Sequence, residues 1–260
     1  MTAATPAAAP AGARRPFPAA RRGTYAFLRD ARDTCHVYLM ADVDATALRA
    51  ARRANEGKLS YVSFVVKAAA DVLTGYPDAR AVLHDGPRPR LAVFDDVHAK
   101  VLFDKTVDGQ RCVVSGTVLA AQSRTVLEVQ DAIDTYKDAE VAETGPFAQV
   151  RRMQRLPLPL VRLVYRLALR DPARRAALQG TFAVTSIGHE PVRAIFPMVS
   201  GTLGFGVGRI ADEAVVRAGE IGVAPRFTLS LSFDHRVLDG AMAAEVLARV
   251  KDRLETWEMP

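Results

Sequence analysis

A strict alternation of apolar and hydroxylated residues near the C-terminus constrains the fold of this chain more than any other feature. Residues 227–233 read Phe-Thr-Leu-Ser-Leu-Ser-Phe. A period of two is typical of a β-strand with one packed face. The alternation stops at Asp234, and a helical pattern covers residues 241–250. We therefore expect a buried strand that opens through a short turn into a helix.

The predicted turn carries His235, which is followed by Asp239 and Gly240. The unperturbed pKa of histidine is about 6.5, so its imidazole is largely neutral yet still basic at cellular pH. Rigid elements on both sides would hold the ring in one orientation, as general-base catalysis requires. Asp239 could fix the turn by pairing with an arginine or with backbone N–H groups. A surface turn with a non-catalytic histidine and a helix-capping Asp239 is the alternative.

Residues 232–241, Ser-Phe-Asp-His-Arg-Val-Leu-Asp-Gly-Ala, resemble the active-site signature of the dihydrolipoyl acyltransferases of 2-oxoacid dehydrogenase complexes. Residues 180–188 resemble the hydroxyl-bearing strand of that family, and residues 206–210 resemble the segment that follows it. Weaker similarity covers the chain from about residue 21 onward. The resemblance implies an α/β fold like that of chloramphenicol acetyltransferase, a mixed sheet with helices packed on one face.

The resemblance also implies roles for individual residues. His235 would deprotonate the thiol or hydroxyl group of an acceptor, which then attacks a thioester carbonyl. Thr185 falls at the position of the hydroxyl that hydrogen-bonds the oxyanion, and Ser186 is the alternative donor. Asp239 would hold the turn by pairing with an arginine near the N-terminus. The candidates for that arginine are Arg21, Arg22 and Arg29.

The family forms trimers in which each site takes its histidine and its hydroxyl from neighbouring subunits, so the resemblance implies a homotrimer. The acyl donor would be acyl-coenzyme A or an acyl-dihydrolipoyl group. No lipoyl domain is recognised in this sequence, so a lipoyl group would come from another chain. Residues 255–260 depart from the apolar tail that joins trimers in large cores, which predicts an isolated trimer. Two alternatives stay open: a catalytically idle trimeric scaffold, and an acyltransferase for a carrier-bound or small-molecule acceptor.

Composition narrows the class of protein. Of the 260 residues, 49% are hydrophobic and 25% are charged, as is typical of a globular chain. The net charge of +6 favours anionic partners such as coenzyme A phosphates, an acidic carrier protein, nucleic acid or a membrane surface, and charge alone does not choose among them. With the family resemblance, we expect no nucleic-acid partner. Cys35 and Cys112 are too few for a disulfide framework, so we expect a cytoplasmic protein. They form no Cys-x-x-Cys zinc signature, and we expect neither a metal nor a covalent cofactor. No stretch approaches the roughly 20 apolar residues of a transmembrane segment.

The sequence predicts a tail and one domain. Residues 1–13 are almost entirely Ala, Pro, Thr and Gly, which predicts a disordered tail. Residues 14–260 are predicted to form a single acyltransferase catalytic domain. Within it, residues 147–178 are the least family-like stretch and predict a basic amphipathic helical insertion. A surface helix packed on the body would account for this stretch, and so would a docking surface for an acidic carrier protein or a membrane.

Periodicity and capping residues place the remaining elements. We expect a strand over residues 36–43, a helix over 45–55 capped by Asp44, a helix capped by Ser60, and a helix over 126–136. Turn residues break residues 91–119 into several β-rich runs. The glycines at 201, 204, 206 and 208 alternate within an apolar β pattern without a following helix, which excludes a dinucleotide-binding loop.

Overall fold

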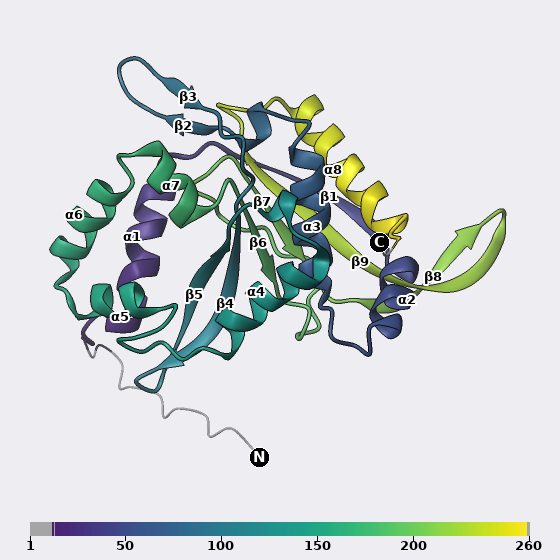
Figure 1. Ribbon diagram of the computed structural model, residues 1–260, viewed down its shortest axis with the longest axis horizontal. Coiled ribbons are helices and arrows are strands. Elements are labelled where there is room, and N and C mark those ends of the chain that lie inside the picture. Colours follow the sequence, from purple (N-terminus) through teal and green to yellow (C-terminus); the bar gives the residue numbers. More distant parts are fainter. Residues whose placement is uncertain (1–11, 13, 259–260) are drawn as a thin grey trace.

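The fold was analysed in a computed structural model that describes residue 12 and residues 14–258. The tail predicted at residues 1–13 therefore lies, but for residue 12, outside the described residues. Within residues 14–258 the centre is a mixed seven-stranded sheet, ordered β1-β9-β7-β6-β4-β5, with β8 paired to β9 (Figure 1). β6 is parallel to β4 and β7. The strands are β1 (His36–Asp44), β4 (Ala99–Val107), β5 (Gln110–Val118), β6 (Phe182–Ser186), β7 (Leu203–Val207), β8 (Ala211–Arg217) and β9 (Glu220–Asp234).

Helices cover one face of the sheet, and a separate group of helices gathers beyond its β5 edge. In Figure 1, α3 and α8 lie across the sheet, whereas α1, α5, α6 and α7 cluster on the left. A small hairpin, β2 (Val82–His84) and β3 (Arg90–Ala92), projects at the top. The α-helices are α1 (Arg22–Asp30), α2 (Thr46–Ala54), α3 (Tyr61–Leu73), α4 (Val126–Asp138), α5 (Ala148–Arg155), α6 (Leu158–Ala168), α7 (Pro172–Gln179) and α8 (Gly240–Glu255). Short 3₁₀ helices cover Ala19–Arg21, Ala31–Asp33, Asp78–Arg80 and Ala121–Ser123.

The alternating strand near the C-terminus is the C-terminal half of β9. Its apolar residues point into the core beneath α3 and α8; these are Phe227, Leu229, Leu231 and Phe233, each at most 2% exposed. The strand is longer than the predicted residues 227–233, because its first residues pair only with β8 in an exposed hairpin. The sequence pattern is weak there because neither face of that hairpin is packed.

The capping predictions hold, with one correction. Ser60 accepts a hydrogen bond from the Ser63 N–H at 3.1 Å and caps α3. Asp44 is not the N-cap residue of α2, because the helix begins at Thr46 and Ala45 occupies that position. The Asp44 carboxylate nevertheless accepts from the Thr46 N–H at 3.0 Å. Asp44 therefore satisfies a free donor of α2 from one residue further out.

The alternating glycines of β7 accommodate a loop that runs back over the sheet. A side-chain carbon at Gly206 would overlap the carbonyl oxygen of Ile195, and one at Gly208 would overlap that of Arg193. The glycines therefore let the backbone of residues 193–199 lie directly on the strand. The prediction that they form part of a strand rather than a phosphate-binding loop is confirmed for Gly204 and Gly206.

Residues 147–178 are helical, as the sequence predicts, and they form the three short helices α5, α6 and α7. Pro157 is the N-cap residue of α6, and Pro172 begins α7. Proline fixes its own φ and has no N–H to donate, so it separates helices at these positions. Arg162 and Arg166 lie one turn apart on α6, whereas Arg170 lies beyond the end of this helix at Ala168.

Candidate active site

His235 lies in the turn between β9 and α8, where the sequence predicted it. Its backbone N–H donates to the carbonyl of Cys35, at the start of the neighbouring strand β1, at 2.9 Å. Its ring lies 5.6 Å from that of Phe233 in the core. The residue itself is exposed. The turn is thus fixed to rigid elements while the imidazole stays accessible to a substrate.

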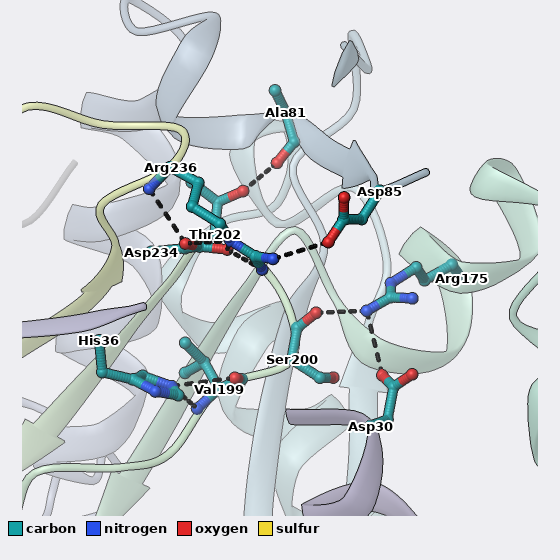
Figure 2. Close-up of polar contacts among 10 residues, drawn as sticks. All are labelled: Asp30, His36, Ala81, Asp85, Arg175, Val199, Ser200, Thr202, Asp234 and Arg236. Atoms are coloured by element: carbon teal, nitrogen blue, oxygen red, sulfur yellow. Dashed lines mark hydrogen bonds and ion pairs between the residues drawn. The ribbon is translucent and has the colours of Figure 1, made fainter. Parts of the chain in front are cut away.

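The carboxylate of Asp234 closes this turn (Figure 2). Asp234 is only 3% exposed. It accepts from the backbone N–H of Arg236 at 3.1 Å and from its guanidinium at 2.6 and 2.9 Å. Arg236 also pairs with Asp85, after β2, at 2.9 Å. Asp234, as the main hydrogen-bond partner, raises the pKa of Arg236, so the guanidinium is charged. We had not predicted this pair, although both residues flank His235 in the sequence.

The loop before β7 holds the same region from the other side (Figure 2). The carbonyl of Thr202 accepts from the backbone N–H of Asp234 at 2.9 Å. The hydroxyl of Thr202 donates to the carbonyl of Ala81. The backbone N–H of Val199 donates to Nε2 of His36 at 3.0 Å. Consequently β1, β9 and the loop before β7 support one rigid platform under His235.

Thr185 lies elsewhere on the sheet. It pairs with Gly206 of β7, which pairs with Ser230 of β9. Leu229 and Leu231 point to the helix side, so by alternation the row of Thr185 faces the side without helices. Ser186 points the other way, and its Oγ accepts from the Gly188 N–H at 3.3 Å. Thr185 therefore has the freer hydroxyl of the two candidates.

The histidine and the hydroxyl do not meet within one chain. His235 follows Ser230, the residue in register with Thr185, by five positions of β9. At about 3.3 Å per residue this is a separation of roughly 16 Å along the strand, before the distance across two strands is added. Within one chain the two candidate residues therefore lie too far apart to act on the same carbonyl group.

Asp239 occupies the N-cap position of α8, but its side chain makes no capping hydrogen bond. Its backbone carbonyl accepts from the Ala243 N–H at 3.0 Å. Its carboxylate forms no ion pair with any of the residues that the structure describes. Neither the helix cap nor the arginine pair that we considered is present within one chain.

None of the three candidate arginines forms an ion pair with Asp239 among residues 14–258. Arg22 donates to the carbonyls of Gln154 at 2.9 Å and Leu156 at 2.8 Å. It thereby fastens α1 to the junction between α5 and α6. Arg21 and Arg29 are exposed and form no ion pair among residues 14–258.

A buried lysine shares the sheet face of Thr185. Lys100 of β4 pairs with Ala183, two residues before Thr185. Burial lowers the pKa of Lys100 to about 8. Its ammonium donates to Gln179 and lies 4.5 Å from the ring centre of Phe27. The burial of Lys100 leaves no pattern in the sequence, because the residue lies in a β-rich run without a motif around it.

The described residues lack two features. No three or more His, Cys, Asp or Glu side chains among them are grouped to hold a metal ion. None of the helices within residues 14–258 combines the length and the apolar character that crossing a bilayer needs.

Comparison with known proteins decides the family. The model of the 2-oxoacid dehydrogenases acyltransferase family (catalytic domain) matches residues 10–144 and 164–259. The chain belongs to this family. A relative in this acyltransferase family is the dihydrolipoyllysine-residue acetyltransferase component of the pyruvate dehydrogenase complex of Bacillus subtilis, 31% identical over 227 residues. The match covers 83% of this chain and 44% of the relative.

The Staphylococcus aureus protein of the same name is 26% identical over 254 residues, which are 94% of this chain and 51% of that protein. The acyltransferase chain thus spans about half the length of the curated relatives it matches. The family model leaves residues 145–163 unmatched, within and just before the stretch that the sequence marked as least family-like.

Solved structures establish the acyltransferase fold. A probable dihydrolipoamide acetyltransferase from Listeria monocytogenes is 20% identical with a TM-score of 0.71, covering 95% of this chain and 96% of that one. Chloramphenicol acetyltransferase is 13% identical with a TM-score of 0.52, covering 92% and 96%. The predicted α/β fold, a mixed sheet with flanking helices, is confirmed.

Proposed function

We propose that this chain transfers an acyl group between a thioester donor and a thiol or hydroxyl acceptor. The donor is acyl-coenzyme A or an acyl-dihydrolipoyl group. The observation that carries the proposal is the position of His235, exposed at the end of a buried strand whose turn is closed by Asp234 and Arg236. General-base catalysis needs an accessible imidazole held in one orientation, and this platform supports both requirements.

The chemistry is a direct transfer between two bound substrates. Neutral His235 takes the proton from the acceptor S–H or O–H, and the acceptor attacks the thioester carbonyl. The carbonyl oxygen gains negative charge, to which the hydroxyl of Thr185 donates. Collapse of the tetrahedral intermediate breaks the carbon–sulfur bond. The leaving thiolate then regains a proton from the imidazolium, so His235 is neutral again.

A second chain would complete this site. His235 and Thr185 are separated within one chain, which favours a homotrimer with sites shared between neighbouring chains. In each shared site, one chain supplies His235 and its neighbour supplies Thr185. An apolar patch on the sheet face without helices supports such a contact. It is formed by Tyr38, Met40, Phe196 and Met198, which are 42–66% exposed. Light scattering should give the mass of three chains, and a mass far above three chains would contradict the isolated trimer.

The acceptor in this proposal is a thiol or hydroxyl group of a second substrate. The names of the relatives favour a dihydrolipoyl group. An acyl carrier protein or a small molecule is the alternative acceptor, and a catalytically idle scaffold is the alternative function. The exposed thiol of Cys35 and the free thiol of Cys112 fit the reducing cytoplasm in which we place the enzyme.

The test is the rate of coenzyme A release from acetyl-, propionyl- and longer acyl-coenzyme A, with and without dihydrolipoamide. Release that requires both dihydrolipoamide and His235 would support a lipoyl acyltransferase. The His235→Ala variant supplies the comparison, and His84→Ala, an exposed histidine of the β2–β3 hairpin, is the matched control. A rate that is the same with His235→Ala would reject the proposed mechanism. The absence of any turnover would favour a carrier-bound acceptor or the scaffold.

A further inference from the structure

Helix α6 presents an apolar stripe to solvent. Four aliphatic side chains at positions i, i+3, i+4 and i+7 are 43–53% exposed: Leu160, Leu163, Val164 and Leu167. At about 100° per residue they fall within an arc of about 100° on the helix. Single exposed aliphatic residues are ordinary on a protein surface, but four in one row on one helix are not.

The stripe is held outward by the opposite side of the same helix. Val161 is fully buried and Leu169, just after the helix, is 6% exposed. The hydroxyl of Tyr165 accepts from the amide of Gln179 on α7. In Figure 1, α6 lies at the outer edge of the molecule, remote from β9 and α8. The stripe is therefore a fixed outer surface, separate from the proposed catalytic site.

Positive charge borders the stripe. Arg162 and Arg166 are exposed and form no ion pair among the described residues. At about 100° per residue they lie on the helix face next to the Leu163 edge of the stripe, about 100° and 60° around the axis from Leu163. Residues 145–170 contain six arginines and no Asp or Glu. The partner of this surface must therefore combine an apolar layer with negative charge.

We propose that α6 binds the surface of a membrane that contains anionic lipids. An apolar face bordered by arginines is the pattern of helices that lie in the plane of a bilayer interface. The aliphatic stripe would enter the boundary between headgroups and acyl chains, and the two arginines would contact lipid phosphates. Eleven residues extend over only about 17 Å, so the helix lies on the bilayer and does not cross it.

Other occupants fit the surface less well. A second copy of α6, packed against the first about a two-fold axis, would bring Arg162 and Arg166 close to the same arginines of its partner. An acidic carrier protein would satisfy the arginines but would leave the aliphatic stripe against a polar surface. A bilayer with anionic lipids satisfies both features at once.

Vesicle sedimentation tests the proposal with the full chain. We expect the chain to sediment with phosphatidylcholine vesicles that contain phosphatidylglycerol, and to do so far less with phosphatidylcholine alone. Reversing both charges in Arg162→Glu/Arg166→Glu should weaken binding by about 25-fold or more, taking about fivefold for each arginine removed. Leu163→Gln/Leu167→Gln should also abolish sedimentation, because it removes the apolar part of the contact.

A matched control separates a local effect from net charge. Arg88→Glu/Arg90→Glu changes the net charge equally, on the exposed β2–β3 hairpin, and should sediment like the unaltered chain. If this control variant lost as much vesicle binding as Arg162→Glu/Arg166→Glu, the loss would be due to overall charge, and the proposal would be overturned. The proposal would also be overturned if the unaltered chain bound neither kind of vesicle. Binding of an acidic acyl carrier protein through Arg162 and Arg166, in place of vesicles, would overturn it as well. Added salt should weaken vesicle binding by the unaltered chain, which gives a second measurement if a variant fails to fold.

Discussion

The guanidinium and the backbone N–H of Arg236 both donate to the buried carboxylate of Asp234, two residues earlier in the chain. This contact closes the turn that carries His235 and connects it, through Asp85, to the β2–β3 hairpin. Because Asp234 is only 3% exposed, its charge depends on Arg236 for compensation. The ion pair between Asp234 and Arg236 therefore holds the turn in one conformation.

Replacement of Arg236 by Ala should lower the free energy of unfolding by about 2 kcal/mol, since it leaves a buried carboxylate with little compensation. The rate of acyl transfer should fall as well, because the turn can then hold His235 in several orientations. Urea unfolding and coenzyme A release measure the two effects. Asp85→Ala is the control, because Asp85 is exposed and an exposed pair contributes less than about 1 kcal/mol. Equal losses in both variants would contradict the role assigned to Asp234.

Removal of the hydroxyl in Thr185→Ala should lower turnover by about 10²–10³-fold, the loss typical of a single oxyanion donor. The Thr185→Ser variant keeps the oxygen and should stay close to the unaltered chain. Ser186→Ala should have little effect, because Ser186 faces the other side of the sheet and accepts from Gly188. Unchanged turnover in Thr185→Ala, with loss in Ser186→Ala, would transfer the role to Ser186.

Gly206→Ala should destabilise the chain by about 2 kcal/mol or more, because the added carbon would collide with the Ile195 carbonyl and the Ser230 hydroxyl. Gly222→Ala, in the exposed part of β9, meets nothing within 4 Å and should change stability by less than about 0.5 kcal/mol. Thermal unfolding of the two variants gives the comparison. A tolerant Gly206→Ala would mean that residues 193–199 do not lie on the strand as described.

Lys100 predicts a pH dependence of stability. Burial lowers its pKa from 10.5 to about 8, so between these values the folded chain has released a proton that the unfolded chain still holds. The free energy of unfolding should therefore rise with pH across this window, by at most about 3 kcal/mol. Urea unfolding at pH 7 and pH 9.5 measures the rise. Lys100→Met should lack it, and an equal rise in that variant would assign the effect to other groups.

Local sequence patterns predicted much of the fold. The strand at residues 227–233 was predicted because burial of one face imposes an alternation of apolar and polar residues. The helix after Ser60 was predicted because an N-cap position favours serine. The outer half of β9 was missed, because Ile221 and Val223 are exposed and no packed face imposes alternation there. Residues 147–178 are helical, but their division into three helices follows from Pro157 and Pro172, which separate the helices at their N-termini.

The candidate site was predictable to the extent that it is contiguous in the sequence. His235 was placed correctly, since a strand and a helix flank it directly. The position of Thr185 relative to His235 depends on which strands pair, and the register through Gly206 and Ser230 cannot be read from one sequence. The ion pair of Asp234 with Arg236 was overlooked because hydrogen bonding inside a turn leaves no periodic signal.

The central claim is that His235 of one chain and Thr185 of another form one acyl-transfer site, and mixed oligomers test it most directly. His235→Ala and Thr185→Ala are each expected to be nearly inactive. When the two are unfolded together and refolded as mixed trimers, about one quarter of the sites should regain both groups and their activity. His235→Ala mixed with the double variant His235→Ala/Thr185→Ala should regain none. Activity that stays at the level of the separate variants, in trimers shown to be mixed, would contradict the account.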